Sequence, residues 1–158
     1  MVSQLISFGQ NPVDPPNVAG WPAYYQSPEF YELWINADTL PKRNKFTDLM
    51  IETGYTRNGR KVIIDLIPFA KAVSSNPSNP NQLIQDVFDL LISTDIDQSI
   101  KDNLKKQILL SGQTADYYWT EAWNSYQSNQ NTINYNLVNN RLKALIKYIM
   151  NLPDYQLS

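Results

Sequence analysis

Acidic side chains recur in pairs along this sequence, and paired carboxylates are the usual means of hydrolysing a glycosidic bond. Glu29 and Glu32 stand about one helical turn apart, as do Asp86 and Asp89. Glycoside hydrolysis needs two carboxylates on separate elements that face one cleft. Two carboxylates on one helix are typical of a solvated helix face. The spacing therefore identifies no catalytic residue.

The run Asp95-Ile96-Asp97 could begin a calcium-binding loop. Such a loop needs glycine at its sixth position and glutamate at its twelfth, and this sequence has Ile100 and Lys106 there. We therefore expect no metal site and no cofactor. Both aspartates are better explained as the N-cap and first-turn residues of a helix, where the helix dipole favours negative charge.

Aromatic side chains gather in a proline-rich segment near the start of the chain. A stiff loop could stack their rings on sugars or on the prolines of a partner protein. The alternative is a structural plug, in which Trp21 is buried over the helices and Gly20 is present because only glycine fits the turn. The candidate ligand or partner residues of this loop are Trp21, Tyr24, Tyr25 and Trp34.

Arg43 is a further candidate binding residue. It lies close in sequence to Glu29, Glu32 and Asp38. Its planar guanidinium could clamp loop carbonyls or bind a ligand anion. The alternative is a structural ion pair with one of these carboxylates.

The sequence contains neither histidine nor cysteine. Without imidazole or thiolate, the chain cannot form a Ser-His-Asp or Cys-His nucleophile system, a Cys/His zinc site or a disulfide. The remaining possibilities are catalysis by carboxylate, lysine or tyrosine side chains and metal sites with oxygen ligands only. This loss of reaction classes favours a non-enzymatic role for the chain by itself.

Charge and hydropathy exclude two further classes. The formal net charge is −2 and the basic residues are scattered, so the sequence offers no basic stripe for nucleic acid. The most apolar stretch, residues 62–73, contains Asp65, Pro68 and Lys71, and it is too short to span a membrane. The first residues lack the pattern of an export signal.

The first part of the chain, residues 1–73, predicts short helices around an ordered loop. A first helix ends at Gly9, and the Pro- and Trp-rich loop follows. Ser27-Pro28 opens another helix, and Asp38 caps the next one, which ends at Gly54. The Asn58-Gly59 pair allows a small β-hairpin near residues 55–64, and Asp65 then caps a further helix.

Residues 74–80 predict a linker because Ser, Asn and Pro dominate them, and residues 81–150 predict a helical bundle. Apolar residues recur there at helical spacing, and Ser93-Thr94-Asp95 serves as a turn and cap. Trp119, Trp123 and Tyr126 are expected to pack in the core. The whole chain, residues 1–158, is thus predicted to be one mostly α domain, an irregular helical bundle.

A linked series of motifs runs through the first 45 or so residues. Gly9-Gln10 leads to Pro15-Pro16-Asn17-Val18-Ala19-Gly20-Trp21-Pro22, then to Trp34-Ile35-Asn36, Thr39-Leu40 and Arg43-Asn44. This series resembles the C-terminal signature of a bacterial family, domain of unknown function 1800. Its structural positions are Gly9, Pro15, Pro16, Gly20, Pro22 and Asn36. The chain's ending, residues 151–156, also resembles that of the family, whereas residues 23–31 form a longer insertion than the family's usual glycine-rich connection.

The resemblance implies that the chain is the C-terminal portion of a larger protein, so we expect polypeptide to precede Met1. It also implies export to the periplasm, cell envelope or exterior, and an exported sulfatase-like neighbour as a partner. It assigns no activity. We therefore predict a non-catalytic structural or protein-interaction module. The alternatives are a glycan-binding module, which the abundant Asn and Gln favour, and part of a hydrolase site completed by the absent N-terminal region.

Overall fold

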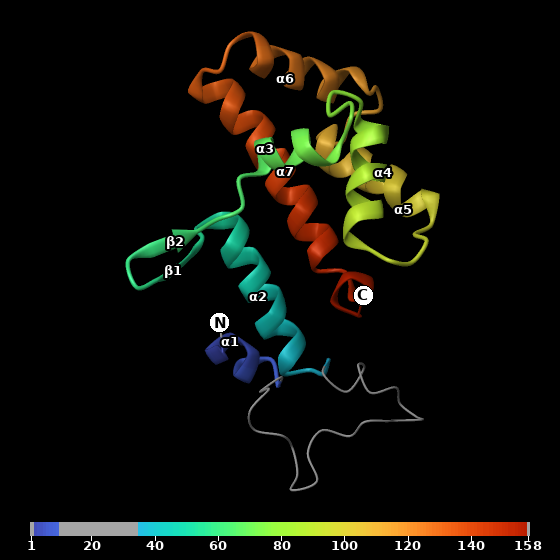
Figure 1. Ribbon diagram of the computed structural model, residues 1–158. Helices are drawn as coiled ribbons and strands as arrows, with labels where there is room; N and C mark the ends of the chain where they lie inside the picture. Colours follow the sequence, from blue (N-terminus) through green and yellow to red (C-terminus); the bar gives the residue numbers. More distant parts are fainter. Residues whose placement is uncertain (1, 10–34, 158) are drawn as a thin grey trace, which may run out of the picture.

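The computed structural model of this chain describes residues 2–9 and 35–157. They form a mostly α fold, as the sequence predicts, with one two-stranded sheet (Figure 1). The helices are α1 (Val2–Ser7), α2 (Thr39–Glu52), α3 (Leu66–Val73), α4 (Pro80–Leu91), α5 (Gln98–Leu104), α6 (Tyr117–Ser128), α7 (Thr132–Met150) and α8 (Pro153–Leu157). A π-helical turn, η2 (Lys105–Leu109), follows α5, and the strands are β1 (Tyr55–Arg57) and β2 (Arg60–Val62).

Helix α7 is the centre of this arrangement (Figure 1). It packs against α2, α3, α4, α6, η2 and α8. Its apolar residues recur every three or four positions, so one face is continuously buried, including Val138, Leu142, Leu145 and Ile149. Burying each such side chain stabilises the fold by roughly 1.5–3 kcal/mol. Apolar contacts along this face therefore help to hold the other helices to α7.

Helix α1 ends at Ser7, and Gly9 stops it just beyond its last turn, as predicted, because glycine tolerates the positive φ of +75° found there. The predicted cap of α2 is wrong. Asn36 caps this helix, since its Oδ1 accepts hydrogen bonds from the N–H groups of Asp38 and Thr39, both at 2.9 Å. Asp38 already has helical dihedrals and makes no capping hydrogen bond, and its carboxylate binds Lys42 at 2.6 Å instead.

The predicted hairpin is present. Asn58 and Gly59 have φ values of +50° and +73°, the positive values that a type I′ turn requires. The strands pair from Tyr55 with Val62 to Arg57 with Arg60. Gly54, at φ +79°, joins α2 to this hairpin.

The segment between α3 and α4 is held by α6. The indole Nε1 of Trp119 donates to the carbonyl of Pro77 at 2.8 Å, and the Thr120 hydroxyl donates to the carbonyl of Ser78 at 2.8 Å. Pro80, predicted to end the linker, is the first residue of α4, a position that tolerates its missing N–H. Asn79 caps that helix through two backbone N–H groups.

Two predicted helix starts need correction. Asp65 precedes α3 but its side chain makes no capping hydrogen bond. Asp97, rather than Asp95, caps α5, because its extended backbone lets Oδ1 accept from the N–H of Ser99 at 2.7 Å. Hydrogen bonding to the side chain of Ser99, and then to its backbone N–H, lowers the pKa of the Asp97 carboxyl.

The aromatic residues of α6 belong to the core, as predicted. Trp119, Trp123 and Tyr126 are all buried. Their rings form a chain with centroid distances of 5.7 Å and 6.5 Å. These three residues are therefore packing residues of the bundle.

Candidate functional site

Most of the predicted binding and signature residues lie outside the residues that the structure describes, so their roles stay predictions. They are Trp21, Tyr24, Tyr25, Trp34, Pro15, Pro16, Gly20 and Pro22. The described candidates are Gly9, Asn36 and Arg43. Gly9 ends α1 and Asn36 caps α2, so only Arg43 has a side chain that faces a cavity.

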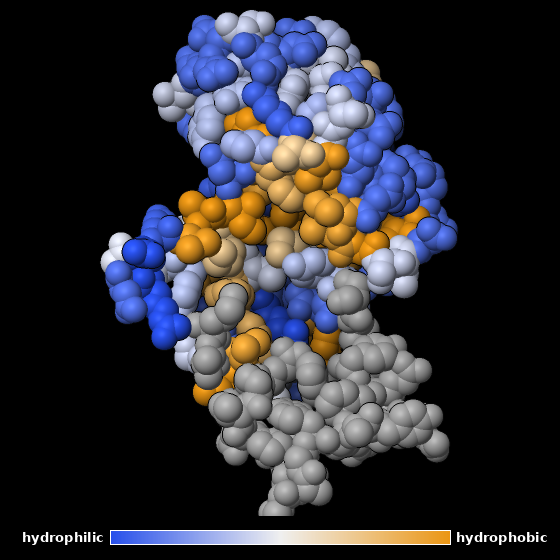
Figure 2. Space-filling view, in the orientation of Figure 1, coloured by the Kyte–Doolittle hydropathy of each residue, from blue (hydrophilic) through white to orange (hydrophobic). Residues whose placement is uncertain are grey.

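That cavity is an open groove of about 530 Å³. We call it the α2 groove, because four of its lining residues come from that helix. Its lining is mostly apolar and includes Phe8, Phe46, Met50, Ile64, Leu90 and Met150. Its volume falls within the range of small-ligand pockets, about 300–1,000 Å³. Figure 2 shows apolar side chains gathered across the middle of the molecule, below a mostly polar upper surface.

Arg43 brings a positive charge to the α2 groove. The guanidinium carbon lies 5.4 Å from the centroid of the Phe8 ring, within the range of a cation–π contact. Its Nε is buried and has no hydrogen-bond partner. Partial burial lowers the pKa of Arg43, although an arginine stays protonated under ordinary conditions. The predicted partner Asp38 binds Lys42, and Glu29 and Glu32 lie outside the described residues.

The other carboxylates of α2 face α7 and are paired there. Glu52 lies 3.2 Å from the ammonium groups of both Lys143 and Lys147, and Asp48 lies 3.5 Å from that of Lys147. Hydrogen bonds from the two lysines lower the pKa of Glu52, and the bond with Glu52 raises that of Lys147. These pairs join two helices.

The acidic pair of α4 is also engaged locally. Gln82 donates to Asp86 and Gln85 donates to Asp89, each at 2.7 Å along the same helix. Within residues 2–9 and 35–157, no group of acidic side chains has a spacing that could hold a metal ion.

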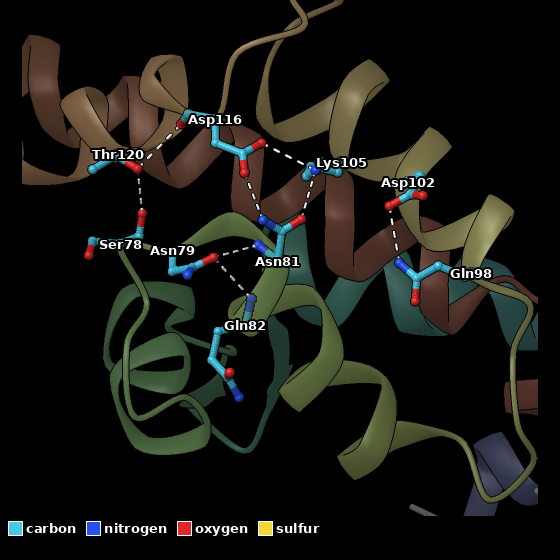
Figure 3. A network of polar contacts seen from close by, with 9 residues as sticks. All are labelled: Ser78, Asn79, Asn81, Gln82, Gln98, Asp102, Lys105, Asp116 and Thr120. Atoms are coloured by element: carbon cyan, nitrogen blue, oxygen red, sulfur yellow. Dashed lines mark hydrogen bonds and ion pairs between the residues drawn. The ribbon is translucent and has the colours of Figure 1, made fainter.

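A second polar cluster joins α4, η2 and α6 (Figure 3). Asn81 donates to Asp116 and accepts from Lys105, both at 2.7 Å, and Lys105 lies 3.2 Å from Asp116. Every one of these polar groups has a partner from another element. The cluster therefore fixes the helices relative to one another and leaves no unpaired group for a ligand.

Sequence reasoning missed most of the α2 groove. Its walls come from helices far apart in the chain, and no local pattern shows that Met50 and Met150 share one cavity. One signal was available. Leu90 is apolar but falls outside the helical spacing of Ile84, Val87 and Leu91. The structure leaves it 57% exposed.

The family model described as protein of unknown function (DUF1800) matches residues 1–157. The chain belongs to this family. The predicted resemblance is thereby confirmed, and the family match covers essentially all of this chain. No curated protein and no solved structure matches the sequence significantly. None of the helices in the described parts of this chain is long and apolar enough to cross a membrane.

Proposed function

We propose that this DUF1800 chain is a non-catalytic structural and protein-interaction module of an exported bacterial protein. Its docking surface is the α2 groove, and the occupant is an apolar helix of a partner protein. The open apolar lining around Met50 and Met150 carries this proposal. Methionine side chains are flexible and polarisable, and they adapt to the shape of a docked partner.

A helical occupant suits the chemistry of the groove walls. No residue of the strands β1 and β2 lines the groove, so it offers no sheet edge to an extended peptide. A peptide backbone that enters an apolar groove must satisfy its own hydrogen bonds, and a helix does so internally. The volume of about 530 Å³ accommodates side chains from one helix face.

The rigidity of the bundle supports the structural part of the proposal. Buried apolar side chains on α7 and the Asn81, Lys105 and Asp116 cluster hold the helices in register. A groove whose walls are already fixed loses little conformational entropy when a partner binds. The family resemblance supports export and makes a sulfatase-like neighbour the first partner to test.

Site-specific cross-linking tests this function, because the chain has no native cysteine. A photoreactive maleimide is attached to the intact protein at Leu90→Cys, in the groove wall. The matched control carries it at Ile133→Cys, which replaces a 78% exposed residue about 25 Å along α7 from Met150. The purified sulfatase-like neighbour should form a covalent adduct with the first protein and not with the second. Equal adducts from both positions, or none, would contradict docking in the groove.

The two alternative functions stay predictions. Glycan binding depends on Trp21, Tyr24, Tyr25 and Trp34, and calorimetry against a panel of glycans tests it directly. A shared hydrolase site would require Arg43, and unchanged turnover by the full-length protein with Arg43→Ala would argue against that role.

A further inference from the structure

We propose that Arg43 selects the partner helix by binding a side-chain carboxylate on its docked face. This inference rests on the α2 groove being a docking surface, and it makes Arg43 the residue that determines specificity there. The occupant is thus an amphipathic helix with an aspartate or glutamate among its apolar contact residues.

Charge complementarity is the first argument. Arg43 is the one residue among the described lining residues that carries a full charge, and no carboxylate lines the groove beside it. Two described carboxylates close to Arg43 in sequence are already paired with lysines, Asp38 with Lys42 and Asp48 with Lys147. Among residues 2–9 and 35–157, no carboxylate forms an ion pair with Arg43, so its positive charge is available to a group that enters the groove.

Partial desolvation makes that charge more selective. The Arg43 Nε is hidden from water without a hydrogen-bond partner, so the guanidinium has lost part of its hydration. A charge in such surroundings interacts more strongly with a carboxylate than a fully hydrated charge does. It also discriminates against a partner that covers it with an apolar or cationic side chain, because the charge would then be buried unpaired.

Phe8 prepares the guanidinium for this interaction. Its ring, 5.4 Å from the guanidinium carbon, packs in turn edge-to-face against Phe46 at 5.7 Å. These contacts restrict the orientation of Arg43 before a partner arrives. A planar guanidinium held in place can receive a carboxylate in the two-pronged geometry that arginine favours.

Methionine NMR gives a direct readout of this site. The chain has three methionines, and two of them, Met50 and Met150, line the groove. The probes are two synthetic helical peptides with leucines at positions i, i+4 and i+7. They differ only in having glutamate or glutamine at i+3, next to the leucines. Titration of the intact protein, labelled at the methionine methyl groups, yields the dissociation constant of each peptide.

We expect the glutamate peptide to bind roughly tenfold more tightly than the glutamine peptide, because a hydrogen bond to a charged group commonly changes the affinity by about that factor. Arg43→Met should abolish the difference between the two peptides. Arg43→Lys should retain part of the affinity difference between the two peptides. The control Lys106→Met makes a similar change at an exposed position outside the groove and should preserve the full difference.

Each opposite result overturns the inference. Equal affinities of the unaltered protein for the two peptides would show that Arg43 does not bind the glutamate carboxylate. This comparison does not depend on the folding of any variant. A preference that survives Arg43→Met would place the recognition elsewhere. If neither peptide shifts the signals of Met50 and Met150, a helix does not dock there. The Leu90→Cys cross-linking would then decide separately whether a partner of another shape uses the groove.

Discussion

Replacing Trp119 with phenylalanine removes the side chain that ties the α3–α4 connection to the bundle. Trp119 is fully buried, and its Nε1 donates to the carbonyl of Pro77 at 2.8 Å. The variant leaves that carbonyl without its partner, which costs about 1–3 kcal/mol, and it also leaves a cavity. Complete truncation of a buried tryptophan costs about 3–5 kcal/mol, and we assign about 1 kcal/mol to the smaller loss of ring volume here.

The sum predicts that Trp119→Phe lowers the free energy of unfolding by about 2–4 kcal/mol, a large share of the roughly 5–15 kcal/mol typical of a domain. Urea unfolding followed by far-ultraviolet circular dichroism measures this loss without relying on tryptophan fluorescence. The urea dependence of the unfolding free energy should not change, because both proteins expose similar surface on unfolding.

Trp123→Phe is the matched control. Trp123 is also buried in α6, but its indole donates no hydrogen bond to a described residue. This variant therefore loses ring volume alone, and its cost should be about 1 kcal/mol. If Trp123→Phe destabilises the protein as much as Trp119→Phe, the hydrogen bond to Pro77 contributes nothing and our reasoning about the connection is refuted.

Three further predictions concern local structure and charge. Gly54→Ala should cost more than about 2 kcal/mol in urea unfolding, because a Cβ would lie 2.7 Å from a backbone oxygen of β2. Gly112→Ala, at a similar φ of +84° with no atom within 4 Å, should cost only about 1 kcal/mol, and equal losses would contradict the steric argument. Asn36→Ala should lower the melting temperature through about 1 kcal/mol of lost capping, whereas Asp38→Ala should have little effect. The pKa of Glu52 is lower in the folded state, so its stabilising contribution is present at neutral pH and is lost as the pH falls through the folded-state pKa. Glu52→Gln should therefore flatten the acid side of the stability profile, and an unchanged profile would refute the assignment.

Local signals predicted the turns and helix ends well where the backbone conformation admits few residue types. Gly9 and the Asn58-Gly59 pair occur at positive φ, which few other residues tolerate. Cap residues were less predictable, because several aspartates and asparagines near a helix start can each reach the free N–H groups. Asn36 and Asp97 make the capping hydrogen bonds instead of Asp38 and Asp95. The helical dihedrals of Asp38 and the extended ones of Asp97 are part of the reason, and the sequence does not reveal them.

The candidate site was predictable in one residue only. Arg43 was identified by the family signature and by its chemistry, and it does line a cavity. Of the three carboxylates near Arg43 in sequence, Asp38 pairs with Lys42 one helical turn away, and Glu29 and Glu32 lie outside the described residues. The apolar walls of the α2 groove could not be predicted from the sequence, because Met50 and Met150 are a hundred positions apart.

The sequence by itself determined the helical class, the turn positions, the family and the absence of imidazole and thiol chemistry. These properties depend on composition or on interactions within about four residues, so they can be read along the chain. Only the tertiary structure decided that Phe8 and residues of α2, α4, α7 and α8 line one groove, and that no carboxylate among the described lining residues lies beside Arg43. Such features arise when the burial of apolar surface brings distant segments together. Because the hydrophobic effect has no preferred direction, the spacing of apolar residues along the chain does not show which distant segments will meet.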